Sequence, residues 1–177
     1  MNRIAGFAPI IGDKPRVLIL GSMPSVASLE KHQYYGKPQN AFWRVMGALF
    51  GASPDLSYEQ CVSMVTQQRI AIWDVLASCE RPGSLDSAIK MQTAETNDFA
   101  ALLGEQRSIV HVFFNGKKAE EIFRKRCMTA VDSVRPDLTY TALPSTSPAM
   151  ASLNFAEKLE RWSVVARAIS TQAGAAR

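Results

Sequence analysis

The hydrophobic positions of the chain fall into two alternating patterns, which predict strands separated by helices. Short, mainly apolar runs indicate strands at residues 16–21, 70–76, 109–114 and 138–143, and the continuous apolarity of the first suggests burial on both faces. The segments between and after these runs predict helices at residues 40–50, 57–68, 96–104, 117–127 and 152–170. Strands that alternate with helices in this way predict an α/β fold with a parallel sheet and helices on both faces.

The remaining segments carry no regular hydrophobic pattern. Residues 1–15 are expected to form an irregular lead-in, residues 78–89 a turn-rich connection, and residues 171–177 a flexible tail. The chain shows neither an internal repeat nor an interdomain linker, so residues 1–177 are expected to form a single domain.

Charge and hydropathy narrow the function only slightly. The 20 Lys and Arg residues exceed the 16 Asp and Glu residues, and the net charge of +4 permits, without requiring, an anionic partner such as nucleic acid. No apolar run approaches the ~20 residues of a membrane span. The N-terminus also lacks the long apolar segment of a signal peptide. We therefore expect a cytoplasmic protein with no membrane partner.

Residue types that commonly hold metals or cofactors are sparse. Cys61, Cys79 and Cys127 are widely separated, so reduced thiols are expected in place of disulfides, a zinc site or an iron–sulfur cluster. His32 and His111 are the only histidines, which leaves little for a catalytic triad. The motifs GxGxxG, GxxxxGKS/T and GxSxG are absent, which argues against dinucleotide binding, P-loop chemistry and a serine hydrolase. No metal or cofactor is expected.

Four loops are expected to meet at one edge of the sheet. The carboxyl ends of parallel strands lie together, so these segments converge: 21–25 (GSMPS), 73–75 (WDV), 115–116 (NG) and 143–149 (LPSTSPA). Strands often end in such loops without a function, but two Ser/Pro loops and the adjacent Tyr34 and Tyr35 favour a ligand site. Asp74 is the one carboxylate at a strand end, where it could order water or cap the turn around residues 83–84.

The segments GSMPS, YYGKPQNAFW (34–43), FFNGKKAEE (113–121) and LPSTSPA together resemble the uracil-DNA glycosylase superfamily. More narrowly, they resemble its hypoxanthine-DNA glycosylase (DNA-deoxyinosine glycosylase) branch, which is related to the mismatch-specific uracil-DNA glycosylases. The resemblance covers about residues 16–165. It implies a three-layer α/β/α sandwich on a four-stranded parallel sheet with strand order 2-1-3-4.

The resemblance also implies an activity. The protein would hydrolyse the N-glycosidic bond of a deaminated base, hypoxanthine or uracil, after the base has been flipped out of double- or single-stranded DNA. The products would be the free base and an abasic site. No lysine is obviously placed for a Schiff base, so a monofunctional glycosylase is expected. The protein is also expected to be a monomer. The sequence does not rank hypoxanthine over uracil.

The same resemblance assigns the base pocket and the catalytic groups. Met23 stands where many relatives carry an Asp or Asn that positions water, and the important amide falls at Asn40. Asn40 could hydrogen-bond the base or hold water, or it could cap the helix that follows. Tyr35 falls where relatives stack the extruded base, and an aromatic face of this kind contributes about 1–3 kcal/mol. Tyr34 could add a second face, although both tyrosines also suit a core.

The other predicted site residues follow the loops. Backbone N–H groups of Ser22 and Met23 could donate to the leaving base, Gly21 and Pro24 would complete the pocket, and Asn115 could read a base edge or form a turn. Relatives often begin the last loop with a His that stabilises the departing base, but this chain has Leu143 there. The expected contacts with DNA come from Ser145, Thr146, Ser147, Pro148, Ala149, Met150, Lys37 and Lys117, with Ala149 or Met150 as the wedge.

One alternative from another functional class remains open at this point. A non-catalytic α/β domain that binds nucleotides or nucleic acid would show the same loops and the same basic charge.

Overall fold

The computed structural model describes residues 2–171 and contains the expected parallel sheet. Its strands are β2 (Val17–Gly21), β3 (Ile70–Asp74), β6 (His111–Asn115) and β7 (Thr139–Leu143). They are hydrogen-bonded in the order β3-β2-β6-β7, and every pair is parallel. When these four strands are counted along the chain, the order is 2-1-3-4, so the predicted fold class is confirmed.

The central strand β2 shows why its sequence is apolar throughout. All five of its residues are buried. Leu18 and Leu20 contribute to a core on one face of the sheet, whereas Val17 and Ile19 contribute to a second core on the other face. Side chains alternate between the two faces of a strand, so a strand between two helical layers has no polar position.

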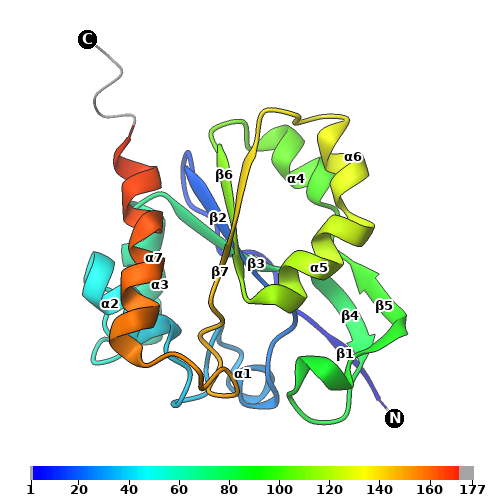
Figure 1. Cartoon of the computed structure of the whole chain (residues 1–177), viewed down its shortest axis with the longest axis horizontal. Coiled ribbons are helices and arrows are strands. Elements are labelled where there is room, and N and C mark those ends of the chain that lie inside the picture. Colours follow the sequence, from blue (N-terminus) through cyan, green and yellow to red (C-terminus); the bar gives the residue numbers. More distant parts are fainter. Residues whose placement is uncertain (1, 172–177) are drawn as a thin grey trace.

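Helices cover both faces of the sheet (Figure 1). On one face lie α2 (Phe42–Phe50), α3 (Tyr58–Gln67) and α7 (Phe155–Ser170), and on the other lie α4 (Phe99–Glu105), α5 (Lys117–Arg126) and α6 (Met128–Asp132). Helices α3 and α7 begin later than predicted because Ser57 and Asn154 lie outside them and form capping boxes. Helix α4 likewise begins after its cap, Asp98.

A second sheet corrects two of the predictions. Strands β1 (Arg3–Ala5), β4 (Leu76–Glu80) and β5 (Lys90–Thr96) form an antiparallel sheet with the order β1-β4-β5. The supposed irregular lead-in therefore contains a strand, and the supposed turn-rich segment begins inside β4 and ends immediately before β5. These short strands carry many polar and charged residues, and their pairing joins distant segments, so no local apolar pattern marks them.

Three further short elements were also not predicted, one of which is α6, directly after α5. Helix α1 (Val26–Lys31) follows β2 and is capped by Ser25, whose hydroxyl accepts a hydrogen bond from the Ser28 N–H. A 3₁₀ turn, η1 (Asp86–Ala88), lies between β4 and β5. Apart from residue 171, the predicted flexible tail lies outside the described residues.

Residues 2–171 hold neither a candidate membrane span nor a candidate metal-binding cluster. None of the helices described there is long and apolar enough to cross a membrane. Within the same range, no three His, Cys, Asp or Glu side chains are grouped so that they could hold a metal ion.

Candidate active site

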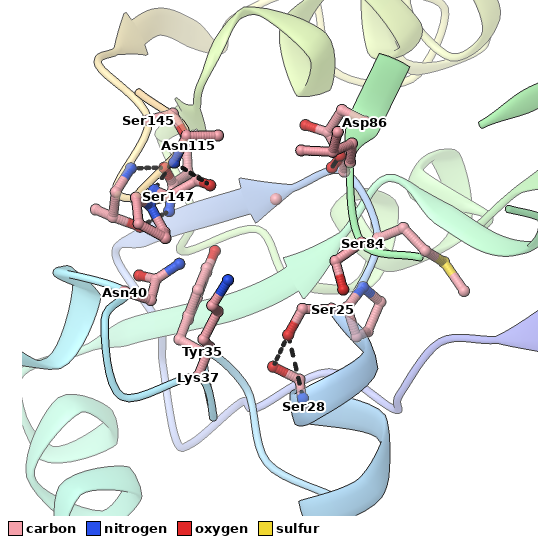
Figure 2. Close-up of a pocket in the computed structure, with 18 of the residues that line it drawn as sticks. Ser25, Ser28, Tyr35, Lys37, Asn40, Ser84, Asp86, Asn115, Ser145 and Ser147 are labelled. Atoms are coloured by element: carbon pink, nitrogen blue, oxygen red, sulfur yellow. Dashed lines mark hydrogen bonds between the residues drawn. The ribbon is translucent and has the colours of Figure 1, made fainter. Parts of the chain in front are cut away.

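A pocket of about 420 Å³ lies at the carboxyl edge of the parallel sheet. Asn40, Tyr35 and Lys37 line one side, and Ser84 and Asp86 lie opposite (Figure 2). The predicted site residues all line this pocket except Lys117, which lies at the start of α5. The converging loops thus create a cavity of a size typical for small-molecule sites.

Tyr35 forms an aromatic wall whose conformation is held from several directions. One face of its ring stacks on Phe42, with ring centroids 3.9 Å apart and an interplanar angle of 21°. Its backbone has a φ of 54°, which is uncommon for a residue other than glycine. The next residue, Gly36, donates its N–H to the Ser28 hydroxyl at 2.9 Å. Because Phe42 covers one face, the opposite face of Tyr35 is available to a flat ligand.

Tyr34 has a mainly structural position. Only 4% of it is exposed, and its hydroxyl donates a hydrogen bond to the Ala8 carbonyl at 2.7 Å. Burial raises the pKa of this hydroxyl, and the ring packs edge-on against Phe7. The Tyr34 carbonyl also accepts a hydrogen bond from the Trp43 indole N–H at 2.9 Å. Tyr34 therefore anchors the loop that presents Tyr35, although it also touches the pocket.

The Asn40 amide is oriented by the helix that follows it. Its Oδ1 accepts the Phe42 N–H at 2.9 Å, but the N-cap of α2 is Ala41, so Asn40 forms a turn just before the helix and is not the N-cap that the sequence suggested. Within residues 2–171, no partner accepts a hydrogen bond from the Asn40 NH₂ group, and Figure 2 shows its amide nitrogen directed toward Tyr35. Since the acceptor oxygen is held by the helix, the amide offers its donor group to the pocket.

Asn115 and Thr146 bind each other through two hydrogen bonds. The Asn115 Nδ2 donates to the Thr146 Oγ1, and the Thr146 backbone N–H donates to the Asn115 Oδ1, both at 2.9 Å. Thr146 is 1% exposed and is held by Asn115, so its observed role is to fix the loop, and the contact with phosphate stays a prediction. Asn115 thus clamps the last loop to the end of β6.

Glycine is required where this clamp forms. Gly116 has a φ of 96°, and a Cβ built on it would lie 3.0 Å from the Ser145 Cβ. A side chain here would meet both backbone strain and a crowded neighbour. The Asn-Gly pair therefore allows the last loop to pack directly against the end of β6.

The serine hydroxyls of the last loop retain their protons for donation. Ser145 Oγ accepts the Ser147 N–H at 3.1 Å, and Ser147 Oγ accepts the Ala149 N–H at 3.2 Å. Beneath them lies Lys158, which is 6% exposed and donates to the Ser147 carbonyl at 3.4 Å. Burial lowers the pKa of this lysine. The sequence did not indicate Lys158, because it occupies an ordinary polar position of α7.

The opposite wall comes from residues 81–88, to which the sequence assigned no function. Ser22 Oγ donates to Asp86 Oδ1 at 2.6 Å, and the Val26 N–H donates to Ser84 Oγ at 2.9 Å. Arg81 is 5% exposed and donates to the Pro24 carbonyl at 2.6 Å and to the Gly83 carbonyl at 2.8 Å. These bonds tie residues 22–26, which follow β2, to residues 81–86 and place Asp86 at the pocket.

Met23 lines the pocket from within a core. It is 7% exposed and packs with the hydrophobic residues on one face of the parallel sheet. Its thioether has no proton to donate and accepts hydrogen bonds only weakly. The side chain can therefore shape the pocket, and any polar contribution must come from its backbone N–H.

Asp74 is the group whose environment is most unusual. It ends β3 opposite Gly21 in the strand register and is 4% exposed. Its Oδ2 is buried without a hydrogen-bond partner among residues 2–171, so the predicted cap of the turn at 83–84 is not formed. Burial, and then the nearby Asp86, raise the pKa of Asp74 to about 7, and Arg81 opposes this shift. The Tyr35 hydroxyl is also buried without a partner in that range.

Gly21 makes this arrangement possible, which leads to a prediction. A Cβ at Gly21 would lie 2.5 Å from Asp74 Oδ1 and 3.0 Å from the Tyr35 hydroxyl. Gly21→Ala should therefore displace both groups, destabilise the protein by about 1–3 kcal/mol, and slow any catalysis at this site by about 10²-fold. Thermal melts and single-turnover assays measure the two effects.

Gly104→Ala provides the matched control for this substitution. A Cβ on Gly104, in helix α4, would meet nothing within 4 Å. The control should keep full activity and gain up to about 1 kcal/mol of stability, because alanine favours a helix. A Gly21→Ala variant that behaved in the same way would show that the pocket tolerates movement of Asp74 and Tyr35.

Comparisons with known proteins place similar sequences and a similar fold in one family. The family model described as the Uracil DNA glycosylase superfamily matches residues 9–166, which include every loop that lines the pocket. Two similar curated proteins are the Hypoxanthine DNA glycosylases of Methanosarcina barkeri and Methanosarcina acetivorans, at 38% and 40% identity over 117 residues, or 66% of this chain and 73% of each relative. A solution NMR structure of a candidate uracil DNA glycosylase from Methanosarcina acetivorans matches with a TM-score of 0.75 and 33% identity, covering 96% of this chain and 99% of that one.

Proposed function

The chain belongs to the uracil DNA glycosylase superfamily, and from this premise we propose that it hydrolyses the bond between hypoxanthine and deoxyribose in DNA. One observation supports this proposal above all: the Asn40 NH₂ group, oriented by the start of α2, lies beside the stacked ring of Tyr35. A flat wall and a fixed donor are what a flipped base needs. The names of the two curated relatives favour hypoxanthine as the base.

The proposed mechanism depends on positioning and on stabilisation of charge. Flipping removes the base from the duplex at a cost of a few kcal/mol, and stacking on Tyr35 offsets part of this cost. As the glycosidic bond breaks, positive charge develops on the sugar and negative charge on the base. A preorganised donor stabilises charge that develops in the transition state, and the Asn40 NH₂ group can supply it.

The last loop is suited to holding the DNA backbone. The hydroxyls of Ser145 and Ser147 can donate to phosphate oxygens, and Lys37 is exposed at the rim of the pocket. Such contacts fix the register of the DNA without reading its sequence. Ala149 and Met150 line the same rim and remain the predicted wedge into the duplex.

The first test uses DNA duplexes and single strands that contain one deoxyinosine or one deoxyuridine. We expect release of hypoxanthine and strand scission only after alkali treatment, because the single lysine of the lining, Lys37, is solvent-exposed. Scission without alkali would contradict a monofunctional mechanism. Binding of DNA without cleavage of either substrate would support the non-catalytic alternative.

Tyr35 provides a second test of the proposed function. Tyr35→Leu should lower kcat/KM for deoxyinosine by about 5- to 150-fold, the equivalent of losing 1–3 kcal/mol of stacking. Tyr35→Phe keeps the ring and should stay close to the wild-type value. Steady-state assays with melts of each variant measure this, and equal losses in both variants would argue against stacking as the role of Tyr35.

A further inference from the structure

We propose that Asp74 is a catalytic residue that donates its proton to N7 of the departing purine. This role rests on the proposed glycosylase function. It supplies a proton donor that the start of the last loop lacks. The residue at the start of that loop is Leu143, which is 5% exposed, packs in a core and has no donor. A leaving purine therefore needs a proton from elsewhere in the pocket.

The position of Asp74 suits this role. It lies at the carboxyl end of β3 and lines the pocket together with Gly21, Tyr35 and Asn40. Because Gly21 has no side chain, Asp74 Oδ1 lies directly against it, where a Cβ would be only 2.5 Å away. The carboxyl group is thus part of the pocket surface although the surrounding protein removes it almost entirely from water.

The Asp74 carboxyl group lacks the hydrogen-bond donors that would stabilise it as a buried anion. A buried carboxylate is costly unless several donors satisfy it, yet Asp74 Oδ2 has no partner among residues 2–171. The only side chain that bonds to this residue in the described range is Asn97, and its Nδ2 contacts the main-chain carbonyl of Asp74 at 2.8 Å. A neutral carboxyl group with its O–H directed at a ligand acceptor satisfies this arrangement.

Burial and the nearby Asp86 keep a substantial fraction of the Asp74 carboxyl group protonated near pH 7. Burial and Asp86 raise the pKa of Asp74 to about 7, and Arg81 acts in the opposite direction. The Arg81 guanidinium is already engaged by the carbonyls of Pro24 and Gly83. Tyr34 and Tyr35 also face Asp74, and their raised pKa values keep both phenols neutral. A catalytic acid works best with a pKa near the working pH.

The proposed step balances in atoms and charge. The bond between C1′ of the sugar and N9 of the purine breaks, and its electron pair leaves with the base. The Asp74 proton moves to N7, so the base departs as a neutral molecule. Water adds to C1′ and releases one proton, which returns Asp74 to its acid form through solvent. Uracil has no basic ring nitrogen equivalent to N7, so this step favours a purine.

The deciding experiment compares pH profiles of the full chain under single-turnover conditions on a deoxyinosine duplex. The wild-type rate should fall tenfold per pH unit above about pH 7, as Asp74 loses its proton. Asp74→Asn should be slower at pH 6 by about 10²–10⁴-fold, the usual contribution of a general acid, and should lose this alkaline limb. Asp98→Asn, at an exposed cap of α4, should match the wild type throughout.

A second measurement needs no variant and so does not depend on folding. A duplex with 7-deazahypoxanthine has a carbon in place of N7, and the wild-type protein should release this base at least about 10²-fold more slowly than hypoxanthine. Release at an equal rate, or an Asp74→Asn variant that keeps the wild-type rate and profile, would overturn the role of Asp74 alone. A wild-type protein that releases no hypoxanthine at any pH would overturn the proposed function and this role together.

Discussion

Asn40→Ala should slow the release of hypoxanthine by about 10²–10³-fold, the usual effect of removing one donor to developing charge. The Asn40 NH₂ group lies at the pocket, and its oxygen is held by the Phe42 N–H. The substitution also removes the hydrogen bond from the Phe42 N–H and should destabilise the protein by about 1 kcal/mol. Single-turnover kinetics on a deoxyinosine duplex and denaturant unfolding measure the two effects separately.

Asn40→Ser is the control that separates catalysis from stability. A serine hydroxyl can accept the same N–H two residues further on but has no NH₂ group to offer. We expect the serine variant to unfold like the wild type and to be as slow as the alanine variant. If alanine kept the wild-type rate, Asn40 would have no part in the mechanism; if serine alone recovered the rate, the amide would matter only through its hydrogen bond with the Phe42 N–H.

Asp74→Asn should become more stable relative to the wild type as the pH rises. The pKa of Asp74 is raised from 3.8 to about 7, so between these values the folded state binds more protons than the unfolded state. The wild type must then lose stability as the pH rises through this window, whereas asparagine does not titrate. From pH 5 to pH 8 the difference in unfolding free energy should shift in favour of the variant by about 3 kcal/mol at most.

Urea unfolding at the two pH values measures this difference, and Asp137→Asn is the control of opposite sign. Arg135 holds the pKa of Asp137 down to about 2 through a hydrogen bond at 2.8 Å. The stability contributed by that carboxylate is present above pH 3.8 and is lost only toward pH 2. The effect of Asp137→Asn should therefore be the same at pH 5 and pH 8. An equally constant effect for Asp74→Asn would show that Asp74 titrates normally.

The parallel sheet could be predicted because a strand that is buried on both faces, such as β2, consists of consecutive apolar residues. Each of its strands is short and mainly apolar, and in β2 every residue is buried. The antiparallel sheet could not be predicted in the same way. Strand β1 pairs with β4 across more than seventy residues, through polar partners such as Arg3 and Glu80. Pairing of that kind depends on where the rest of the chain brings the two strands.

The candidate site, like the fold, could be predicted only in part from the sequence. The order of strands and loops, read from the sequence, was enough to bring Asn40, Tyr35 and the last loop to one edge, because parallel strands end together. The residue types also indicated which side chains can stack and which can donate. The sequence could not show that Thr146 turns inward to Asn115, or that residues 81–88 place Asp86 opposite Tyr35.

By itself, the sequence determined the layered α/β fold, its family and the set of loops that form the pocket, because hydrophobic periodicity and motif spacing are local properties of the chain. Only the tertiary structure decided which groups in that pocket remain free to act. The Asn40 NH₂ group is available because a helix holds the amide oxygen. The pKa of the Asp74 carboxyl is raised by burial and by Asp86, against the opposing effect of Arg81, and its Oδ2 has no hydrogen-bond partner among residues 2–171. Hydrogen-bond partners and burial arise between distant segments, so they exist only once the chain has folded.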